Sequence, residues 1–318
     1  MSDIKKRKII LDCDPGHDDA VAIMMAASNP GIELLGVTIV SGNQTVEKTT
    51  LNGLKVLQWI GKGDIPCFQG CSRPMIREKL NAGDIHGETG LDGPVFPPLT
   101  LKIQEKHAVN FIIDTLMESD GDITMVTTGP MTNLGMALRM KPEIADKIQE
   151  IVLMGGAYTN GNVTPAAEFN IIADADAAYV CFTCGRPIRM MGLDITRKVL
   201  CTPDIVERMR QVGTIASDLF VDLMGHFCKT QYEIFGWAGG PLHDPCTIAY
   251  LINPDVIKSK YVNATIDIRS TESYGRTNCD MFDYMKKPKN CHVAYDIDAD
   301  MFWDIVEREL ARYPKSEK

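Results

Sequence analysis

Short apolar runs alternate with longer amphipathic stretches through the first two hundred residues of the chain. Five of the runs are rich in Ile, Val, Leu and Met and have the length of buried strands, namely 9–13, 34–40, 123–127, 151–154 and 188–192. The stretches between them have the length and spacing of helices, namely 18–28, 45–60, 106–118 and 131–140. This alternation predicts an α/β fold, with a mostly parallel central sheet and helices on both of its faces.

Small or oxygen-bearing residues follow each of these predicted strands. They are Asp14, then Ser41-Gly42-Asn43, then Thr128-Gly129-Pro130, then Gly155-Gly156, and finally Asp194. Because binding sites in parallel sheets gather beyond the carboxyl ends of the strands, we expect a ligand at this edge.

Two segments interrupt the alternation. Residues 70–99 are rich in Gly and Pro and are too long for a routine connection, which predicts a lid or a binding loop. Residues 225–244 end in Gly239-Gly240-Pro241-Leu242-His243-Asp244 and are interpreted as a loop that leads into a helix beginning near Pro245.

Composition narrows the class of protein without identifying it. The 318 residues could form one large domain or two smaller ones, and 45% hydrophobic with 24% charged residues is typical of a globular protein. A net charge of -9 argues against nucleic acid or an anionic membrane as a partner, and no apolar run is long enough to span a bilayer. The ten scattered cysteines and the lack of room for a signal peptide before the first strand predict a reduced, cytoplasmic setting.

The strongest local signal is a cluster of carboxylates at the end of the first strand. Asp14, Asp18 and Asp19 straddle a Pro-Gly turn, and Asp12 precedes them. Helix capping would explain one of these residues but not all of them. Carboxylates this close repel one another unless a cation lies among them, and an all-oxygen set without convergent Cys or His favours Ca²⁺ or Mg²⁺ over zinc.

Two further constellations support a binding site, although each has an ordinary structural explanation. His243-Asp244 could be a simple turn or cap, but it follows a Gly-Gly-Pro backbone that would fix its approach. Glu168-Phe169-Asn170, with Asn162 before it, could be a loop and a helix start. It also supplies the hydrogen bonds and the apolar wall that a sugar requires.

Taken together, five separated motifs resemble the inosine-uridine nucleoside hydrolase family. They are D-x-D-P-G-H-D-D at 12–19, S-G-N at 41–43, T-G-P-M-T-N at 128–133, E-F-N-I-x-A-D at 168–174 and G-G-P-x-H-D at 239–244. Within the family the chain is most similar to the bacterial pyrimidine-specific ribonucleoside hydrolases, through residues 85–93 and 229–233.

The resemblance implies a single domain over residues 1–318, built on a Rossmann-like open sheet, that holds one Ca²⁺ and hydrolyses the N-glycosidic bond of ribonucleosides, preferring uridine and cytidine. It places the ion on Asp14, Asp19, the main-chain carbonyl of Thr128 and Asp244, and it makes Asp14 the general base. Family members are commonly homotetramers or dimers, and we expect a homo-oligomer, with a tetramer favoured over a dimer.

The family pattern also assigns the residues around the substrate. Asp18 and Asn170 would hold the 2′-hydroxyl, Asp244 the 3′-hydroxyl, and Asn162 with Glu168 the 5′-hydroxyl, while Asn43 and Met154 would line the ribose pocket. His243, which is a second catalytic candidate, and Gln231 would contact the base. The binding site would also include His86, Phe169 and Phe235. Close relatives tend to have Tyr where this chain has Phe235, so a phenol is absent.

Three other functions stay open on sequence grounds. The protein could be a broad-specificity or purine-accepting nucleoside hydrolase, or a catalytically silent protein that binds nucleosides or ribose. A metal-dependent phosphohydrolase is a weaker alternative, because no Arg or Lys lies between Asp12 and Glu47 to bind a phosphate, and the histidines of an HD-type cluster are not evident near His17-Asp18.

Overall fold

The computed structural model describes residues 6–80 and 87–317, and within these ranges eight strands form one sheet in the order β3-β2-β1-β4-β5-β6-β12-β9. In chain order they are β1 (Arg7–Cys13), β2 (Ile32–Ile39), β3 (Cys67–Gln69), β4 (Ile123–Thr127), β5 (Ile148–Met154), β6 (Ile188–Met191), β9 (Ile257–Val262) and β12 (Cys291–Ile297). Neighbouring strands are parallel, except that β9 runs antiparallel to β12. The five predicted strands and the mostly parallel sheet are confirmed.

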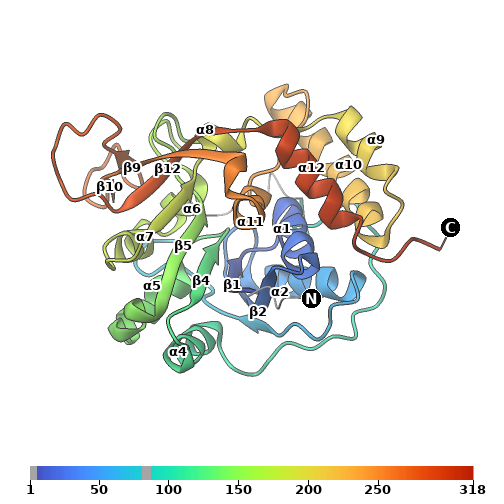
Figure 1. Ribbon diagram of the computed structural model, residues 1–318, viewed down its shortest axis with the longest axis horizontal. Coiled ribbons are helices and arrows are strands. Elements are labelled where there is room, and N and C mark those ends of the chain that lie inside the picture. The colour runs from blue at the N-terminus through green and yellow to red at the C-terminus, as the bar shows by residue number, and fades with distance from the viewer. Residues whose placement is uncertain (1–5, 81–86, 318) are drawn as a thin grey trace.

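Helices cover both faces of this sheet (Figure 1). One hydrophobic core packs α1 (His17–Ser28), α2 (Val46–Trp59), α9 (Pro203–Arg210), α10 (Ile215–Phe235), α11 (Pro245–Ile252) and α12 (Ala299–Leu310) against one face. A second core packs α4 (Ala108–Glu118), α5 (Thr132–Met140) and α7 (Ala175–Phe182) against the other. The four helices predicted among the first five strands are therefore present, each within two residues of its predicted limits.

The remaining elements are short. They are α6 (Phe169–Ala173), α8 (Leu193–Thr196), two 3-10 helices at Pro142–Lys147 and Pro254–Val256, and two small antiparallel sheets that pair β7 (Leu200–Cys201) with β8 (Gly240–Pro241) and β10 (Ala264–Ile266) with β11 (Thr277–Cys279). The described parts of segment 70–99 contain neither helix nor strand, as their Gly and Pro content predicts.

Strand β1 shows how the sheet directs the acidic residues that follow it. Ile9 and Leu11 belong to one core and Ile10 to the other, which is the two-residue alternation of a strand buried on both faces. Asp12 lies on the same face of β1 as Ile10. Its Oδ1 accepts hydrogen bonds from Thr38 of β2 (2.6 Å) and Asn133 of α5 (2.8 Å). The end of β1, just before the site, is therefore held by hydrogen bonds to both β2 and α5.

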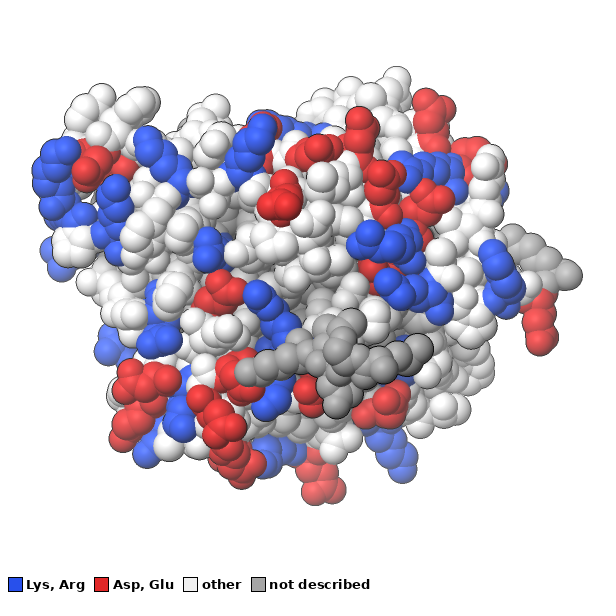
Figure 2. Space-filling view, viewed as in Figure 1, with Lys and Arg blue, Asp and Glu red and all other residues white. Residues whose placement is uncertain are grey.

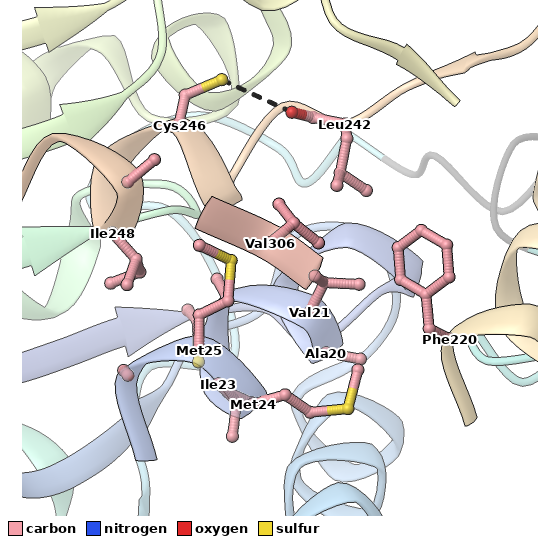
Figure 3. Close-up of a cluster of buried hydrophobic side chains, with 14 of the residues drawn as sticks. Ala20, Val21, Ile23, Met24, Met25, Phe220, Leu242, Cys246, Ile248 and Val306 are labelled. Carbon is pink, nitrogen blue, oxygen red and sulfur yellow. Dashed lines mark hydrogen bonds between the residues drawn. The ribbon is translucent and has the colours of Figure 1, made fainter. Parts of the chain in front are cut away.

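Helix α1 is buried on all sides, so the first turn that carries Asp18 and Asp19 has a rigid support. Residues from His17 to Ala26 are all buried, and Figure 3 shows Val21 and Met24 among side chains from α10, α11 and α12. A helix that is apolar all round is a core helix, and each fully buried Val, Leu, Ile or Met side chain contributes roughly 1.5 to 3 kcal/mol to folding.

The interpretation of 225–244 as a loop is wrong for its first half. Helix α10 continues to Phe235 and ends at Gly236, whose φ of 68° is the left-handed conformation typical of a helix C-terminus. Phe220, Phe227 and Gln231 are buried along it at helical spacing, a periodicity that the polar residues between them obscure. The loop begins at residue 236, and Pro245 starts α11 as predicted.

The surface charges, the helix lengths and the cysteines give no sign of a further binding site in the described ranges. On the face in Figure 2, positive and negative side chains are interspersed rather than gathered into a basic stripe. None of the helices in the described ranges is both long and apolar enough to cross a membrane. All ten cysteines are free thiols, with Cys181 inside α7 and Cys184 just after it.

Candidate active site

Three buried carboxylates from distant parts of the chain converge at the carboxyl edge of the sheet. Asp18 and Asp19 lie in the first turn of α1 and Asp244 lies immediately before α11, and each offers an oxygen within 4.8 Å of the other two. Such a group could hold a metal ion. Asp14 lies outside this closest group, yet the charges of Asp19 and Asp18 both act on it.

Burial raises the pKa of every carboxyl in this cluster, and repulsion from neighbouring carboxylates raises it further for Asp14, Asp19 and Asp244. Burial is the larger cause for all four; with it, the charge of Asp18 raises the pKa of Asp19 to about 7, and the charges of Asp18, Asp19 and Asp14 raise the pKa of Asp244 well above its ordinary value. The pKa of Asp14 is likewise raised well above its usual range. A cluster in this state is stabilised by a proton or a cation.

Two glycines allow the backbone to close around Asp14. A Cβ atom on Gly42 would lie 2.0 Å from Asp14 Oδ2, and one on Gly129 would lie 2.3 Å from Asp14 Oδ1. The main-chain N–H of Asn43 donates to Oδ2 at 2.6 Å, whereas Oδ1 is buried and has no hydrogen-bond partner among the described residues. One oxygen of Asp14 is thus fixed and the other is left available.

The neighbouring donors complete an all-oxygen set that fits a hard divalent cation. Asp19 is held by the N–H of Gly16 (3.0 Å) and the hydroxyl of Thr128 (2.8 Å). The carbonyl of Thr128, at the end of β4, accepts a hydrogen bond from Asn170 at 2.7 Å. Carboxylate and carbonyl oxygens are the ligands that Ca²⁺ and Mg²⁺ prefer, and the unpartnered Asp14 Oδ1 is the kind of atom that such an ion satisfies.

A cavity of about 530 Å³ opens beside the carboxylates. The predicted site residues that line it are Asp18, Asn43, Thr128, Met154, Asn162, Glu168, Phe169, Asn170, Gln231, Phe235, His243 and Asp244. Asp14 and Asp19 are fully buried and are not among its lining residues. His86 lies outside the described residues.

Glu168 organises the side of the cavity near β5 and α6. Its carboxylate is the N-cap of α6, accepting from the N–H of Asn170 (2.9 Å) and also from the N–H of Gly156 (2.8 Å). Burial raises its pKa to about 7 despite these donors. Asn162 Oδ1 accepts from the N–H of Phe169 at 2.9 Å, which fixes the loop before the helix.

His243 and helix α10 form the opposite side. Nδ1 of His243 lies 2.7 Å from the hydroxyl of Thr196, and burial, together with the charge of Arg197, lowers the His243 pKa to about 3. Gln231 is 4% exposed, while Phe235, one turn later on the same helix, is 49% exposed. The cavity therefore passes from a buried acidic end to a partly open aromatic end.

Several lining residues were not predicted from the sequence. They are Leu80, Gly161, Val163, Leu193, Arg197 and Phe227, with Trp237 recognised only as near the site in sequence. Arg197 follows α8 directly after β6, so its place beyond a strand end was a usable signal. Asp194, which also follows β6, instead accepts hydrogen bonds from the N–H groups of Tyr158 (2.9 Å) and Thr159 (3.2 Å) and is not a lining residue.

Comparisons with known proteins agree with this geometry. A family model described as inosine-uridine preferring nucleoside hydrolase matches residues 9–304. The chain is 55% identical over 313 residues to the pyrimidine-specific ribonucleoside hydrolase RihB of Escherichia coli, covering 98% of this chain and 100% of that protein. Among solved structures, the purine-preferring ribonucleoside hydrolase from Gardnerella vaginalis superposes with a TM-score of 0.89 at 33% identity, covering 96% of this chain and 98% of that one. The plant nucleoside hydrolase PpNRh1 has a TM-score of 0.88 at 30% identity, covering 96% and 99%.

Proposed function

This chain belongs to the inosine-uridine preferring nucleoside hydrolase family and is a ribonucleoside hydrolase, and we propose that its preferred substrates are the pyrimidine ribonucleosides uridine and cytidine. The observation that carries the proposal is the convergence of buried carboxylates beside a cavity whose far end presents Gln231 and aromatic rings. The pyrimidine-specific relative at 55% identity supports the choice of base.

We assign the metal as Ca²⁺, held by Asp14, Asp19, the carbonyl of Thr128 and Asp244. The all-oxygen donors and the unpartnered Asp14 Oδ1 support this set. Ca²⁺ accepts six to eight oxygens in flexible geometry, so water and sugar hydroxyls could complete its coordination, whereas Mg²⁺ demands a stricter octahedron. When bound, the ion would lower the pKa of a water molecule and offset the repulsion among the carboxylates.

Asp14 is the proposed general base. The N–H of Asn43 donates to its Oδ2 and so fixes the orientation of the carboxylate, which would lie beside both the ion and the water that the ion activates. In the reaction, the oxygen of water forms a bond to C1′, its proton passes to Asp14, and the C1′–N bond breaks with its electron pair going to the base. The base leaves as an anion and takes a proton from solvent, and Asp14 later returns its proton to solvent, so the products are ribose and the neutral free base.

The sugar would be held by hydroxyl contacts on the acidic side of the cavity. We assign the 2′-hydroxyl to Asp18 and Asn170, the 3′-hydroxyl to Asp244, the 5′-hydroxyl to Asn162 with Glu168, and the ring wall to Asn43 and Met154. Loss of the base leaves positive charge on the sugar, and buried carboxylates beside the ring oppose that charge more in the transition state than in the substrate.

The base would lie toward helix α10. Gln231 offers an amide to a pyrimidine edge, and Phe169 and Phe235 offer apolar surface. His243, held through Nδ1 by Thr196, would present its other ring nitrogen to the leaving base and assist its departure. His86 remains part of the proposed binding site on sequence grounds alone.

Release of free base from uridine, cytidine and inosine, followed with Ca²⁺ present, tests the proposal. We expect kcat/KM to be higher for both pyrimidine nucleosides than for inosine. Faster release from inosine would favour the alternative that the enzyme accepts purine nucleosides. That alternative is worth testing because a solved structure at 33% identity is described as purine-preferring. Heat of uridine binding without uracil release would instead indicate a silent binder. Light scattering of the same preparation tests the proposed tetramer.

A further inference from the structure

The leaving base needs a partner for negative charge, and this inference rests on the proposed function. When the bond from C1′ to N1 breaks, the electron pair moves to the pyrimidine and spreads onto its O2. Phe235 has no hydroxyl to offer, and among the described residues that line the cavity there is no Tyr. Arg197 is the one Lys or Arg in that same set.

Arg197 is held in place without being neutralised. Its Nη2 donates to the carbonyl of Gly161 at 3.2 Å, and its Nε is buried and has no hydrogen-bond partner in the described ranges. No carboxylate there forms an ion pair with the guanidinium. Arg197 is half-buried and its charge also acts on the Glu168 carboxylate, but no ion pair ties up the guanidinium, so it can still interact with negative charge that develops nearby.

Arg197 is anchored at Gly161, beside the loop that carries Asn162, and its other neighbours lie on the base side of the cavity. Its guanidinium lies 5.9 Å from the centre of the Trp237 ring, which in turn lies 5.2 Å from the Phe235 ring. Phe235 is one helical turn beyond Gln231 on α10. Thr196, the residue before Arg197, holds the ring of His243.

We propose that the Arg197 guanidinium donates a hydrogen bond to the departing pyrimidine and stabilises the negative charge that the base gains as the glycosidic bond breaks. The guanidinium keeps its proton throughout. The electron pair of the C1′–N1 bond stays with the base, which takes a proton after departure, while the water proton passes to Asp14 as above. Arg197 is thus a catalytic residue for the leaving group, distinct from the residues that hold the sugar.

The test compares substrates whose leaving groups differ in their need for stabilisation. Arg197→Gln removes the charge, and its kcat and KM are measured on uridine, on 5-fluorouridine and on 4-nitrophenyl β-D-ribofuranoside, whose phenolate leaves readily without help. We expect kcat on uridine to fall about 100-fold, the cost of removing one charge-stabilising donor, with a smaller fall on 5-fluorouridine. The nitrophenyl riboside should change by less than about threefold.

Arg186→Gln is the matched control, because Arg186 also has a buried, unpartnered Nε yet does not line the cavity. It should leave all three rates unchanged. Equal losses on all three substrates, or a rise in KM with kcat unchanged, would overturn the assignment of Arg197 to the leaving group. If Arg197→Gln does not fold, Arg197→Lys takes its place, because it keeps the charge but removes the planar guanidinium with its paired N–H donors. Its kcat must still fall more on uridine than on the nitrophenyl riboside. If the wild type releases no uracil but cleaves the nitrophenyl riboside, the proposed pyrimidine preference fails independently of Arg197.

Discussion

Removing the divalent ion should destabilise the protein much more at pH 8 than at pH 5. Burial and the charge of Asp18 raise the pKa of Asp19 from its ordinary value of 3.8 to about 7. Because the folded-state pKa is the higher one, the stability that this group contributes is fully present below pH 4 and is lost as the pH rises through 7. At about 1.4 kcal/mol for each unit of pKa, the whole effect is about 4 kcal/mol, of which about 3 kcal/mol falls between pH 5 and pH 8.

A bound cation replaces the proton as the stabilising partner, so the ion-loaded protein should not show this loss. For a chain of this size about 3 kcal/mol corresponds to about 5 °C in Tm. We therefore expect the rise in Tm on adding Ca²⁺ to chelator-treated protein, measured by scanning calorimetry, to be about 5 °C larger at pH 8 than at pH 5. Asp19→Asn should reduce that difference, because it removes the share of this one carboxyl while Asp14 and Asp244 keep theirs, whereas Asp146→Asn, on the exposed surface, should retain it in full. A Ca²⁺-induced shift that is equal at the two pH values, or larger at pH 5, would refute the reasoning.

Three further changes test the site at single residues. Asp14→Asn should lower kcat on uridine about 1000-fold in steady-state assays while circular dichroism stays unchanged, because it removes the proton acceptor; near-normal turnover would exclude Asp14 as the base. Gly129→Ala places a Cβ 2.3 Å from Asp14 Oδ1 and should cost at least about 100-fold in kcat/KM, whereas Gly225→Ala, whose Cβ would meet no heavy atom within 4 Å, should keep full activity and raise Tm slightly. Gln231→Leu keeps a similar volume but removes the amide, so kcat/KM for uridine should fall about tenfold, and an unchanged value would show that the amide makes no contact with the base.

The strands that sequence patterns predicted are those buried on both faces. Strand β1 and its parallel neighbours are nearly continuous apolar runs, because both sheet faces are covered by helices. Strand β3 has only three residues, and β9 exposes its four middle residues at the antiparallel edge. Edge strands have less apolar surface to bury, so the hydrophobic periodicity of β3 and β9, at the two edges of the sheet, is too weak to predict them.

The acidic half of the site was predictable because several strand ends of a parallel sheet meet at one edge. Asp14 and the motif around Thr128 follow β1 and β4, which are hydrogen-bonded neighbours. Arg197 was not predicted, because it is far in sequence from the acidic motif at residues 12–19. Distance along the chain is a poor guide here, since Arg197 follows β6, two strands away from β4, and still reaches the same cavity.

The two ends of the cavity differ in how strongly the fold constrains them. Asp18 and Asp19 lie in α1, which is buried along nearly its whole length, so a change in that helix disturbs the hydrophobic core together with the chemistry. The base side depends on the last turn of α10, where Phe235 and its neighbour Ile234 are about half exposed. Because substitutions at exposed helix positions cost little stability, the preference for one base over another can change at this end while the acidic end stays intact. This difference gives a structural reason why one fold is shared by relatives described as pyrimidine-specific and as purine-preferring.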